Sequence, residues 1–258
     1  MPGSTSQTAL VTGASVGIGF ELARLLAADG CNLILVSRDE TKLKIISGAL
    51  HTTCGVDVQV MPTDLSEPGA AEKFAGLEID ILINNAGFGV HGRVCDADLQ
   101  KQLDLIQVNV TALTHLSRLV LPGMIERGRG RIMNVASVAA FLPGPFMAAY
   151  YASKAFVLSF SLALSEECRG TGVTVTAVCP GPTQTEFFSR AGINDAPLMR
   201  GQMMSAKKVA EIGYRAMNRG KPMVVTGLAN KFLAQSTRLA PRMLAAKVAG
   251  NRNRGRTA

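Results

Sequence analysis

The sequence predicts a single α/β domain built on a doubly wound parallel sheet of about seven strands, with helices on both faces. The chain has 258 residues, of which 47% are hydrophobic, and this is enough for one large core. Short β-branched or aliphatic runs alternate with helix-length segments, a pattern typical of parallel sheets. The runs are apolar throughout, as expected of strands that helices cover on both faces.

Seven segments are expected to form the strands. In chain order they are Ala9–Val11, Leu33–Val36, Val56–Val60, Ile81–Ile83, Arg131–Val135, Val173–Val178 and Met223–Val225. No repeat or linker interrupts the chain, so we expect one domain over residues 1–258 with its core at about 7–226. Sheets of this kind bind ligands at the carboxyl ends of their strands, which directs the search for a site to the following loops.

The composition argues against a metal site and against a membrane span. Five cysteines are scattered without a CxxC pair and there are only three histidines, so we expect no metal. The N-terminal stretch lacks a basic segment followed by a long apolar run, and no stretch reaches the ~18 apolar residues of a membrane span. We therefore expect a cytoplasmic protein.

The net charge of +8 comes from the end of the chain. Residues 200–258 hold 13 Lys/Arg and one acid, Glu211, whereas residues 1–199 hold 14 Lys/Arg and 18 acids. Most such runs are solvated surface, although phosphate-bearing substrates, anionic lipid and nucleic acid are also possible partners. Aromatic residues are almost absent from this segment, so we expect no nucleic-acid binding.

An apolar stripe crosses this basic segment over Leu228–Gly250 and is broken at Pro241, while the last residues, NRNRGRTA, are expected to fray. The interleaved apolar and basic residues are Leu228, Phe232, Leu239 and Leu244 with Lys231, Arg238, Arg242 and Lys247. The pattern fits a segment on an anionic membrane or one that receives a phosphate-bearing acyl carrier. Because proline interrupts a helix, we favour a helix that caps the fold or forms a subunit interface, and peripheral membrane contact is the less favoured alternative.

A glycine-rich turn, Thr12–Gly19, follows the first expected strand and precedes a helix expected to begin near Phe20. Glycine lets the backbone turn sharply and approach a pyrophosphate, whose charge is met by amides at the helix N-terminus. The turn therefore predicts a dinucleotide site. Its candidate residues are Gly13, Ser15, Gly17, Ile18 and Gly19.

The end of the second strand indicates which dinucleotide is bound. A carboxylate at this position would accept a hydrogen bond from the ribose 2′-hydroxyl and repel a 2′-phosphate, but the chain has Ser37 and the guanidinium of Arg38. We therefore expect NADP(H) in preference to NAD(H). The alternative is that Arg38 begins a helix and is merely solvated, and Val16 supplies no second basic group.

Tyr150 and Lys154 are four residues apart, so a helix would place the phenol and the ammonium on one face, with Ser137 upstream. A nearby cation favours phenolate, and we expect Lys154 together with a positively charged nicotinamide to lower the pKa of Tyr150 from about 10 to about 7. Ser137 would then hold the substrate oxygen. Tyr151 is one position off this spacing, and we interpret it as structural.

With these motifs in place, the chain resembles the short-chain dehydrogenase/reductase family over roughly residues 7–226. The turn Thr12–Gly19 matches the family motif TGxxxGxG, Asn84-Asn85-Ala86-Gly87 matches NNAG, and Ser137 with Tyr150 and Lys154 matches the catalytic Ser and YxxxK. Asn109 matches the helix asparagine, Asp64-Leu65 matches the adenine contact, and Pro180-Gly181-Pro182-Thr183 matches the PG loop. Their order and spacing agree with the family.

The resemblance implies a role for each matched residue. Tyr150 is the general acid in reduction, Ser137 orients the carbonyl, Lys154 binds the nicotinamide ribose, and Asn109 anchors a water relay. The implied cofactor contacts add Asp64, Leu65, Asn85, Ala86, Gly87, Gly181, Thr183 and Thr185. The family also implies a homodimer or homotetramer built on the helices that contain Asn109 and Tyr150.

Apolar residues border the expected reaction centre. A lid at about 184–204 contains Phe187, Phe188, Ile193, Leu198, Met199, Met203 and Met204, and the segment before Tyr150 contains Phe141, Leu142, Phe146 and Met147. They suggest a lipophilic carbonyl substrate, such as an acyl, steroid-like or aromatic ketone, unless the lid simply packs on itself. We expect an NADPH-dependent carbonyl reductase that works reversibly. The alternatives are an NAD-dependent secondary-alcohol dehydrogenase and a non-catalytic NADP(H)-binding sensor or scaffold.

Overall fold

The structure is a computed structural model that describes residues 6–193, 203–237 and 241–254. All seven expected strands form one parallel sheet in the order β3-β2-β1-β4-β5-β6-β9. Their bounds are β1 Thr8–Thr12, β2 Asn32–Ser37, β3 Val58–Pro62, β4 Ile81–Asn84, β5 Gly130–Val135, β6 Val173–Cys179 and β9 Met223–Val225. The predicted fold class is thereby confirmed.

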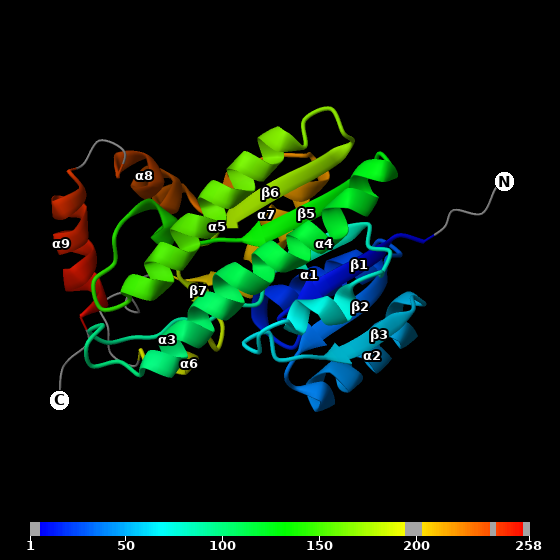
Figure 1. Cartoon of the computed structure of the whole chain (residues 1–258), viewed down its shortest axis with the longest axis horizontal. Coiled ribbons are helices and arrows are strands. Elements are labelled where there is room, and N and C mark those ends of the chain that lie inside the picture. Colours follow the sequence, from blue (N-terminus) through cyan, green and yellow to red (C-terminus); the bar gives the residue numbers. More distant parts are fainter. Residues whose placement is uncertain (1–5, 194–202, 238–240, 255–258) are drawn as a thin grey trace.

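The strand order reverses next to β1, and this reversal creates the site. Val11 of β1 lies opposite Leu35 of β2 on one side and Ile83 of β4 on the other. From β1 the chain builds outward to β3 and then returns to β4, so the loops after β1 and β4 leave the sheet in opposite directions. Figure 1 shows this sheet with the helices around it. The residues of the loops after β1 and β4 line a common cavity.

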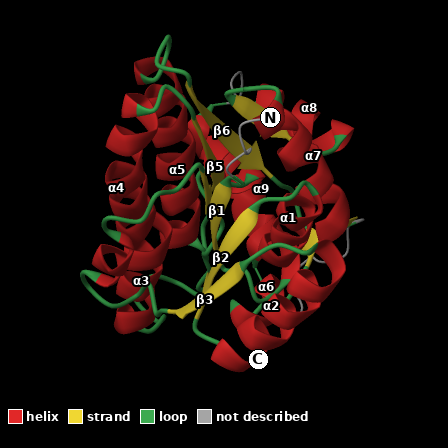
Figure 2. Ribbon diagram, turned by 90° about the vertical axis from the view of Figure 1, so that its right-hand side faces the viewer, coloured by secondary structure: helices red, strands yellow, loops and turns green. Residues whose placement is uncertain are grey.

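Six longer helices cover the two faces of the sheet (Figure 2). One face carries α1 Gly17–Ala28, α2 Glu40–Cys54 and α7 Ala206–Asn218, and the other carries α3 Leu99–Ile106, α4 Leu113–Glu126 and α5 Ala148–Glu167. Alternate strand residues enter the two cores: Val11 packs with Leu22 of α1 and Tyr214 of α7, while Leu10 packs with Leu116 of α4.

The remaining elements complete the described chain. They are η1 Ala70–Phe74, η2 Gln107–Ala112, η3 Val138–Phe141, β7 Thr183–Gln184, α6 Phe187–Arg190, β8 Met204–Ser205, α8 Leu228–Ser236 and α9 Arg242–Asn253. β7 and β8 pair in parallel beside the main sheet. Within the described residues, no helix is both long and apolar enough to cross a membrane.

Local sequence signals explain several helix ends. The Asp39 carboxylate accepts a hydrogen bond of 3.0 Å from the Lys42 amide and so caps α2, and Gly55 ends that helix with a φ of 68°. Ser205 caps α7 in the same way through the Lys208 amide. The two N-terminal caps, at Asp39 and Ser205, hold loops at the carboxyl edge of the sheet, whereas Gly55 lies at the opposite edge, before β3.

Two expected boundaries are wrong. α1 begins at Gly17 and not near Phe20, because the carbonyl of Val16 already accepts the helical hydrogen bond from the Phe20 amide. α9 starts directly after Pro241, as the expected break there requires, but it continues to Asn253, which is buried where fraying was expected. The predicted positions Leu198, Met199, Arg238 and Leu239, and the last residues 255–258, lie outside the described residues.

Candidate active site

A cavity of about 1080 Å³ lies at the carboxyl ends of the strands. Its walls come from the glycine turn after β1 and from the loops after β2, β4, β5 and β6. Every residue proposed above as catalytic or cofactor-binding lines it, except Gly19 and Asn109, which lie behind its wall. The volume suits a dinucleotide and a substrate together, since a pocket for one drug-sized ligand occupies about 300–1,000 Å³.

The glycine turn is pressed against the segment after β4. A Cβ on Gly13, whose φ is +65°, would lie 2.8 Å from the Asn85 side-chain nitrogen, and one on Gly19 would overlap both that nitrogen and the Gly13 carbonyl oxygen. Asn85 Nδ2 donates to the carbonyls of Thr12 and Gly13 at 2.9 and 3.2 Å. Because these glycines have no side chains, the backbone of the turn is open to the cavity at the N-terminus of α1. An exposed backbone at a helix N-terminus fits a pyrophosphate.

Thr12 connects the glycine turn to the segment after β4 through hydrogen bonds, although no role was predicted for it from the sequence. Its hydroxyl donates to the Ile83 carbonyl at 3.2 Å and accepts from the amides of Asn85 and Ala86, each at 3.0 Å. Asn84, by contrast, turns into the core and donates to Ser117 and Asn134. In the NNAG segment, Asn84 therefore belongs to the core, whereas the residues after it line the cavity.

At the ribose end, Arg38 is exposed and its guanidinium lies 3.7 Å from the Asp64 carboxylate. Burial raises the pKa of Asp64, but hydrogen bonds from Ser66 and the charge of Arg38 outweigh it and leave the pKa below its ordinary value. The neighbouring acid, Asp39, also lines the cavity, and its carboxylate is held by the α2 N-terminus and by Lys42. Arg38 thus places an exposed cation in the cavity wall beside Asp39 and Asp64.

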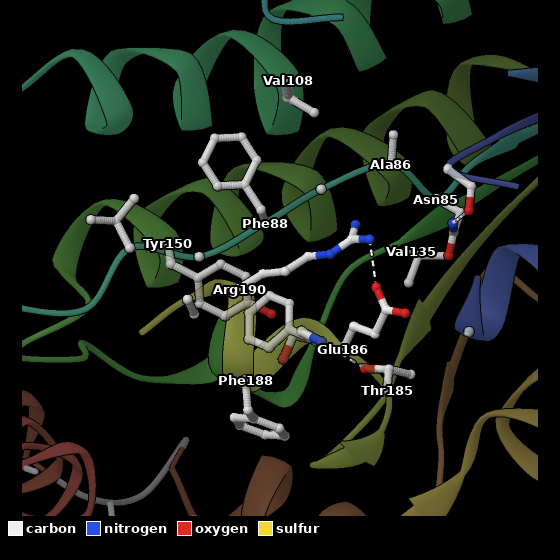
Figure 3. A pocket seen from close by; sticks show the side chains of 18 of the residues that line it. Asn85, Ala86, Phe88, Val108, Val135, Tyr150, Thr185, Glu186, Phe188 and Arg190 are labelled. Atoms are coloured by element: carbon white, nitrogen blue, oxygen red, sulfur yellow. Dashed lines mark hydrogen bonds and ion pairs between the residues drawn. The ribbon is translucent and has the colours of Figure 1, made fainter. Parts of the chain in front are cut away.

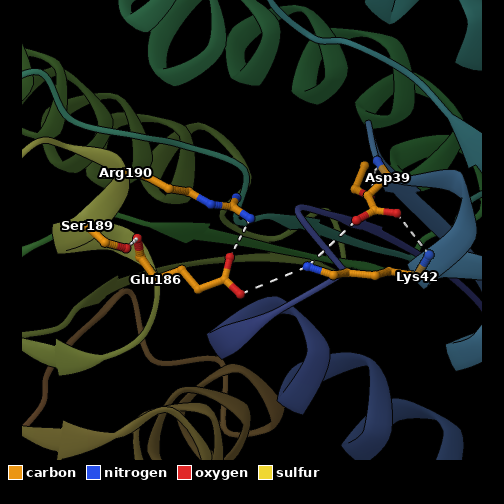
Figure 4. A network of polar contacts seen from close by, with 6 residues as sticks. Asp39, Lys42, Glu186, Ser189 and Arg190 are labelled. Carbon is orange, nitrogen blue, oxygen red and sulfur yellow. Dashed lines mark hydrogen bonds and ion pairs between the residues drawn. The ribbon is translucent and has the colours of Figure 1, made fainter.

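A chain of ion pairs connects α6 with α2 (Figure 4). Glu186 pairs with Arg190 on its own helix and lies 4.0 Å from the Lys42 ammonium, which is 3.6 Å from Asp39. All four side chains are about half exposed, so each pair contributes little to stability. The chain nevertheless joins the loop after β6 to the helix after β2.

Ser137, Tyr150 and Lys154 converge at the other end of the cavity. Tyr150 and Lys154 lie on the buried side of α5, and the Lys154 ammonium is 5.9 Å from the centre of the Tyr150 ring. The Ser137 side chain is hydrogen-bonded to the Tyr150 phenol and caps η3 by accepting from the Ala139 amide at 3.1 Å. The spacing read from the sequence thus yields one cluster.

The pKa values within this cluster differ from the expectation. Burial raises the pKa of Tyr150 well above its ordinary value, although the hydrogen bond with Ser137 acts in the opposite direction. The Lys154 ammonium donates to the Val135 carbonyl at 2.7 Å and does not overcome this burial. Burial also lowers the pKa of Lys154 to about 8, with Cys179 opposing the shift. The protein's own groups therefore raise this pKa, and the lowering expected from Lys154 together with a positively charged nicotinamide stays a prediction.

Asn109 lies in the π-helical turn η2, between α3 and α4. Its amide exchanges two hydrogen bonds with the Phe88 backbone, at 3.2 and 3.1 Å, and donates a third to Ser153 at 3.0 Å. A Cβ on Gly87 would lie 2.9 Å from the Asn109 oxygen and 3.4 Å from the Lys154 ammonium. Asn109 therefore fixes the backbone beside Lys154, and π-helical turns often mark functional sites.

The loop after β6 closes the same end of the cavity. The Thr183 hydroxyl donates to the Gly181 carbonyl at 2.8 Å, and the Thr185 side chain lies against Gly17 of the glycine turn. Phe187 contacts both the Tyr150 ring, at a centroid distance of 5.0 Å, and Phe188. Figure 3 shows Arg190 extending across the pocket to the Glu186 carboxylate.

Contacts over long sequence separations complete the wall, and the sequence interpretation missed them. The Tyr151 hydroxyl donates to the Asn253 side-chain oxygen at 3.0 Å, and the His91 ring is 2.8 Å from the Asn253 carbonyl oxygen. Asn253 also donates to the Pro145 carbonyl at 3.0 Å. Tyr151 and His91 both line the cavity, so Tyr151 is part of the site's wall as well as a structural residue. No local motif signals this contact, because 102 residues separate the two side chains.

Comparison with known proteins identifies the class that this fold and site define. The profile of the short chain dehydrogenase family matches residues 7–195. The chain belongs to the short-chain dehydrogenase/reductase family, whose members are oxidoreductases that bind a nicotinamide cofactor, and the resemblance drawn from the motifs is confirmed.

Individual relatives agree with this assignment. The chain is 34% identical over 225 residues to the ketoacyl reductase HetN of Nostoc sp., covering 83% of this chain and 76% of that one. It is 38% identical over 181 residues to the very-long-chain 3-oxoacyl-CoA reductase of Anas platyrhynchos, covering 67% of this chain and only 58% of that enzyme. A short-chain dehydrogenase from Sphingobium yanoikuyae in complex with NADPH superposes with a TM-score of 0.82 at 33% identity, over 90% of this chain and 93% of that one.

Proposed function

We propose that this chain is an NADP(H)-dependent oxidoreductase that interconverts a carbonyl and a secondary alcohol on a lipophilic substrate. The observation that carries the proposal is the cluster of Ser137, Tyr150 and Lys154 in the cavity that also contains the glycine turn. A phenol, a hydroxyl and an ammonium around one reacting oxygen supply what carbonyl reduction requires beyond the hydride.

Each residue of the cluster has a proposed role. When bound, the nicotinamide supplies or accepts the hydride. Tyr150 donates the proton to the carbonyl oxygen in reduction and accepts it in oxidation, while Ser137 holds that oxygen. Lys154 binds the nicotinamide ribose, and its charge together with that of the oxidised nicotinamide opposes the burial that raises the Tyr150 pKa. Asn109 anchors a water relay that resupplies protons, and Thr183 with Thr185 contacts the carboxamide.

The preference for NADP(H) rests on the charges at the ribose end. Arg38 is exposed, and its ion pair with Asp64 is 3.7 Å long. A 2′-phosphate is a stronger partner for a guanidinium than this carboxylate, because it accepts several charge-assisted hydrogen bonds. Asp39, the acid that would repel such a phosphate, is neutralised by the α2 N-terminus and Lys42.

The substrate class rests on the apolar packing around the cluster. Tyr150 belongs to one hydrophobic cluster with Met147, Phe188 and Ile193, against which Phe187 and Met203 also pack. The relatives named ketoacyl reductase and very-long-chain 3-oxoacyl-CoA reductase favour an acyl ketone among lipophilic carbonyls. Because the chain spans less than two thirds of the very-long-chain enzyme, its chain-length preference is left to a substrate panel.

The remaining features complete the proposal. We infer a cytoplasmic homodimer or homotetramer, with one domain over residues 1–258, a core at about 7–226, a substrate lid at about 184–204 and a basic C-terminal segment at 228–258. The cysteines that the structure describes are all free, which suits a reducing compartment.

The test is loss of NADPH absorbance with ketones graded from small and polar to long and apolar, for the parent and for Tyr150→Phe. Removing the phenol hydroxyl should lower turnover by roughly 10²–10⁴-fold, the usual contribution of a positioned proton donor. Tyr151→Phe is the matched control, because it removes a neighbouring phenol hydroxyl that contacts Asn253 and leaves the proton donor in place.

Each alternative predicts a different result. Faster turnover with NADH than with NADPH would support the NAD-dependent dehydrogenase. Tight NADPH binding with no turnover on any ketone would support the sensor or scaffold. A panel in which small polar sugars react faster than every apolar ketone would contradict the lipophilic substrate.

A further inference from the structure

Helices α8 and α9 lie at one end of the molecule (Figure 1), and both carry large apolar side chains that are exposed to solvent. The exposed fractions are 83% for Leu228, 77% for Phe232, 81% for Met243, 55% for Leu244 and 52% for Val248. The opposite sides of the two helices, at Ala234 and at Ala249 and Asn253, are buried against the fold. The capping role expected from the sequence therefore accounts for one side of each helix and leaves the apolar outer side unexplained.

The charge around these side chains has one sign. Residues 228–258 contain seven Lys/Arg and no Asp or Glu. On the described helices, Lys231 is exposed beside Phe232, and Lys247 is exposed beside Val248. A second copy of the chain on this surface would bring like charges together with no acid to pair with them, so self-association through it is disfavoured. The surface complements an anionic partner.

The same surface adjoins the substrate end of the cavity. Asn253 at the end of α9 is hydrogen-bonded to Tyr151 and His91, which line the cavity, and Gly250 packs on Pro145. On the other side, Asn230 of α8 lies against Gly181 of the PG loop. A partner bound to α8 and α9 is therefore next to the elements that enclose a substrate.

We propose that the outer sides of α8 and α9, which we term the α8–α9 surface, dock the protein on an anionic lipid bilayer. Apolar side chains that flank cationic ones on short helices are typical of helices that lie in the interface between headgroups and acyl chains. A bilayer is favoured over an acidic protein because the protruding side chains need no matching pockets in it. Docking through this surface is separate from the proposed reductase activity. It affects that activity only by bringing the enzyme to a membrane that contains lipophilic ketones.

The experiment is flotation of the full chain with two kinds of vesicle, pure phosphatidylcholine and phosphatidylcholine with about one third phosphatidylserine. The parent should float with the anionic vesicles, and added salt should weaken this binding. Lys231→Glu with Lys247→Glu should weaken it at least about tenfold, because each basic residue near such a surface contributes roughly fivefold. Phe232→Ser with Met243→Ser should have a similar effect through lost apolar insertion.

The matched control combines one exposed apolar and one exposed basic residue elsewhere, Ile45→Ser with Lys73→Glu, and it should float as the parent does. All variants should keep the parent's turnover of a water-soluble ketone, which also shows that they fold. Flotation is read without cofactor or turnover, so its failure would leave the proposed reductase activity intact, and inactivity of the reductase would leave the docking result intact.

Three outcomes would overturn the proposal. In the first, the parent fails to float with anionic vesicles, or both double variants float as well as the parent does. In the second, the parent ignores vesicles but sediments as an oligomer that Phe232→Ser dissociates, so that a second copy covers the surface. In the third, an immobilised acidic acyl carrier protein captures the parent through Lys231 and Lys247 while vesicles do not, which would assign the surface to a protein partner.

Discussion

Lys154 shows how burial sets the chemistry of a single residue. Its ammonium is enclosed by α5 and the end of β5, and it donates a hydrogen bond to the Val135 carbonyl. Burial penalises the charged form and lowers the pKa from 10.5 to about 8. The same burial raises the pKa of Tyr150, so the protein by itself keeps the phenol protonated. A protonated phenol is the form that donates to a carbonyl oxygen.

This shift predicts a stability effect of pH. Between pH 8 and 10.5 the unfolded chain holds the Lys154 proton more tightly than the folded chain, so this group makes stability rise with pH, by at most about 1.4 kcal/mol per pH unit. Cys179 and Tyr150, whose pKa values are raised, act in the opposite direction above about pH 9 and 10. Urea unfolding of Lys154→Met should therefore lack the positive contribution that the parent shows from pH 8 to 9.

The control for Lys154→Met is Lys73→Met, at an exposed position outside the cavity. It should keep the parent's dependence on pH. Identical pH profiles for the parent and Lys154→Met would mean that Lys154 is not desolvated as the structure indicates.

Arg38 predicts the cofactor preference at the same scale. Arg38→Ala should raise KM for NADPH by about 10–100-fold, the loss expected for charge-assisted hydrogen bonds of about 1.5–3 kcal/mol, and should leave KM for NADH nearly unchanged. Arg24→Ala serves as the control, since Arg24 pairs with Glu21 on α1 away from the cavity. Equal losses with both cofactors would show that Arg38 does not distinguish them.

At the scale of elements, the end of α9 acts as a clamp on the loops around the substrate end. Asn253 joins α9 to α5 through Tyr151, to the loop after β4 through His91, and to the loop before α5 through Pro145. Phe146, next to Pro145, has a φ of 66° without being glycine, and Arg254 lies over its ring. Such a backbone conformation persists only where neighbouring contacts hold it.

The clamp predicts a large effect of one substitution outside the catalytic cluster. Asn253→Ala leaves the Tyr151 hydroxyl and the Pro145 carbonyl without these partners. It should cost about 1–3 kcal/mol of stability for the buried hydroxyl and less for the half-buried carbonyl. KM for apolar ketones should rise more than kcat falls, because the wall moves while the proton donor stays in place. Urea unfolding and steady-state kinetics measure the two effects.

Asn251→Ala is the matched control for this substitution, because Asn251 is on the same helical turn and exposed. If Asn251→Ala and Asn253→Ala had the same small effects, the two side-chain hydrogen bonds of Asn253 would not be what holds the wall.

At the scale of the whole molecule, cofactor binding should stabilise the fold. The cavity contacts loops from both halves of the sheet, so a bound dinucleotide connects segments that unfolding separates. At a hundred times its Kd, a ligand adds about 2.7 kcal/mol, which corresponds to a rise in Tm of roughly 5–10 °C for a chain of this size. NADPH should give this rise at lower concentrations than NADH does, as measured by thermal unfolding. The same shift with both would contradict the preference for NADP(H).

The fold could be predicted well because the strands are buried on both faces of the sheet. Such strands are apolar at consecutive positions, and this is visible in the sequence. The third strand deviates most, beginning at Val58 and not at Val56. The glycine turn was predictable for a related reason. Gly13, Gly17 and Gly19 lie in one turn, and the absence of a side chain is visible in the sequence itself.

By itself, the sequence determined the seven-stranded parallel sheet, the glycine turn and the spacing of Ser137, Tyr150 and Lys154, because each depends on residues close together in the chain. Only the tertiary structure decided the direction of the Tyr150 pKa, the place of Tyr151 in the cavity wall and the clamp at Asn253. The physical reason is that burial and hydrogen bonding depend on which distant segments meet. No local pattern in the sequence predicts that Asn253 of α9 contacts Tyr151 of α5, or that Lys154 donates its hydrogen bond to the Val135 carbonyl.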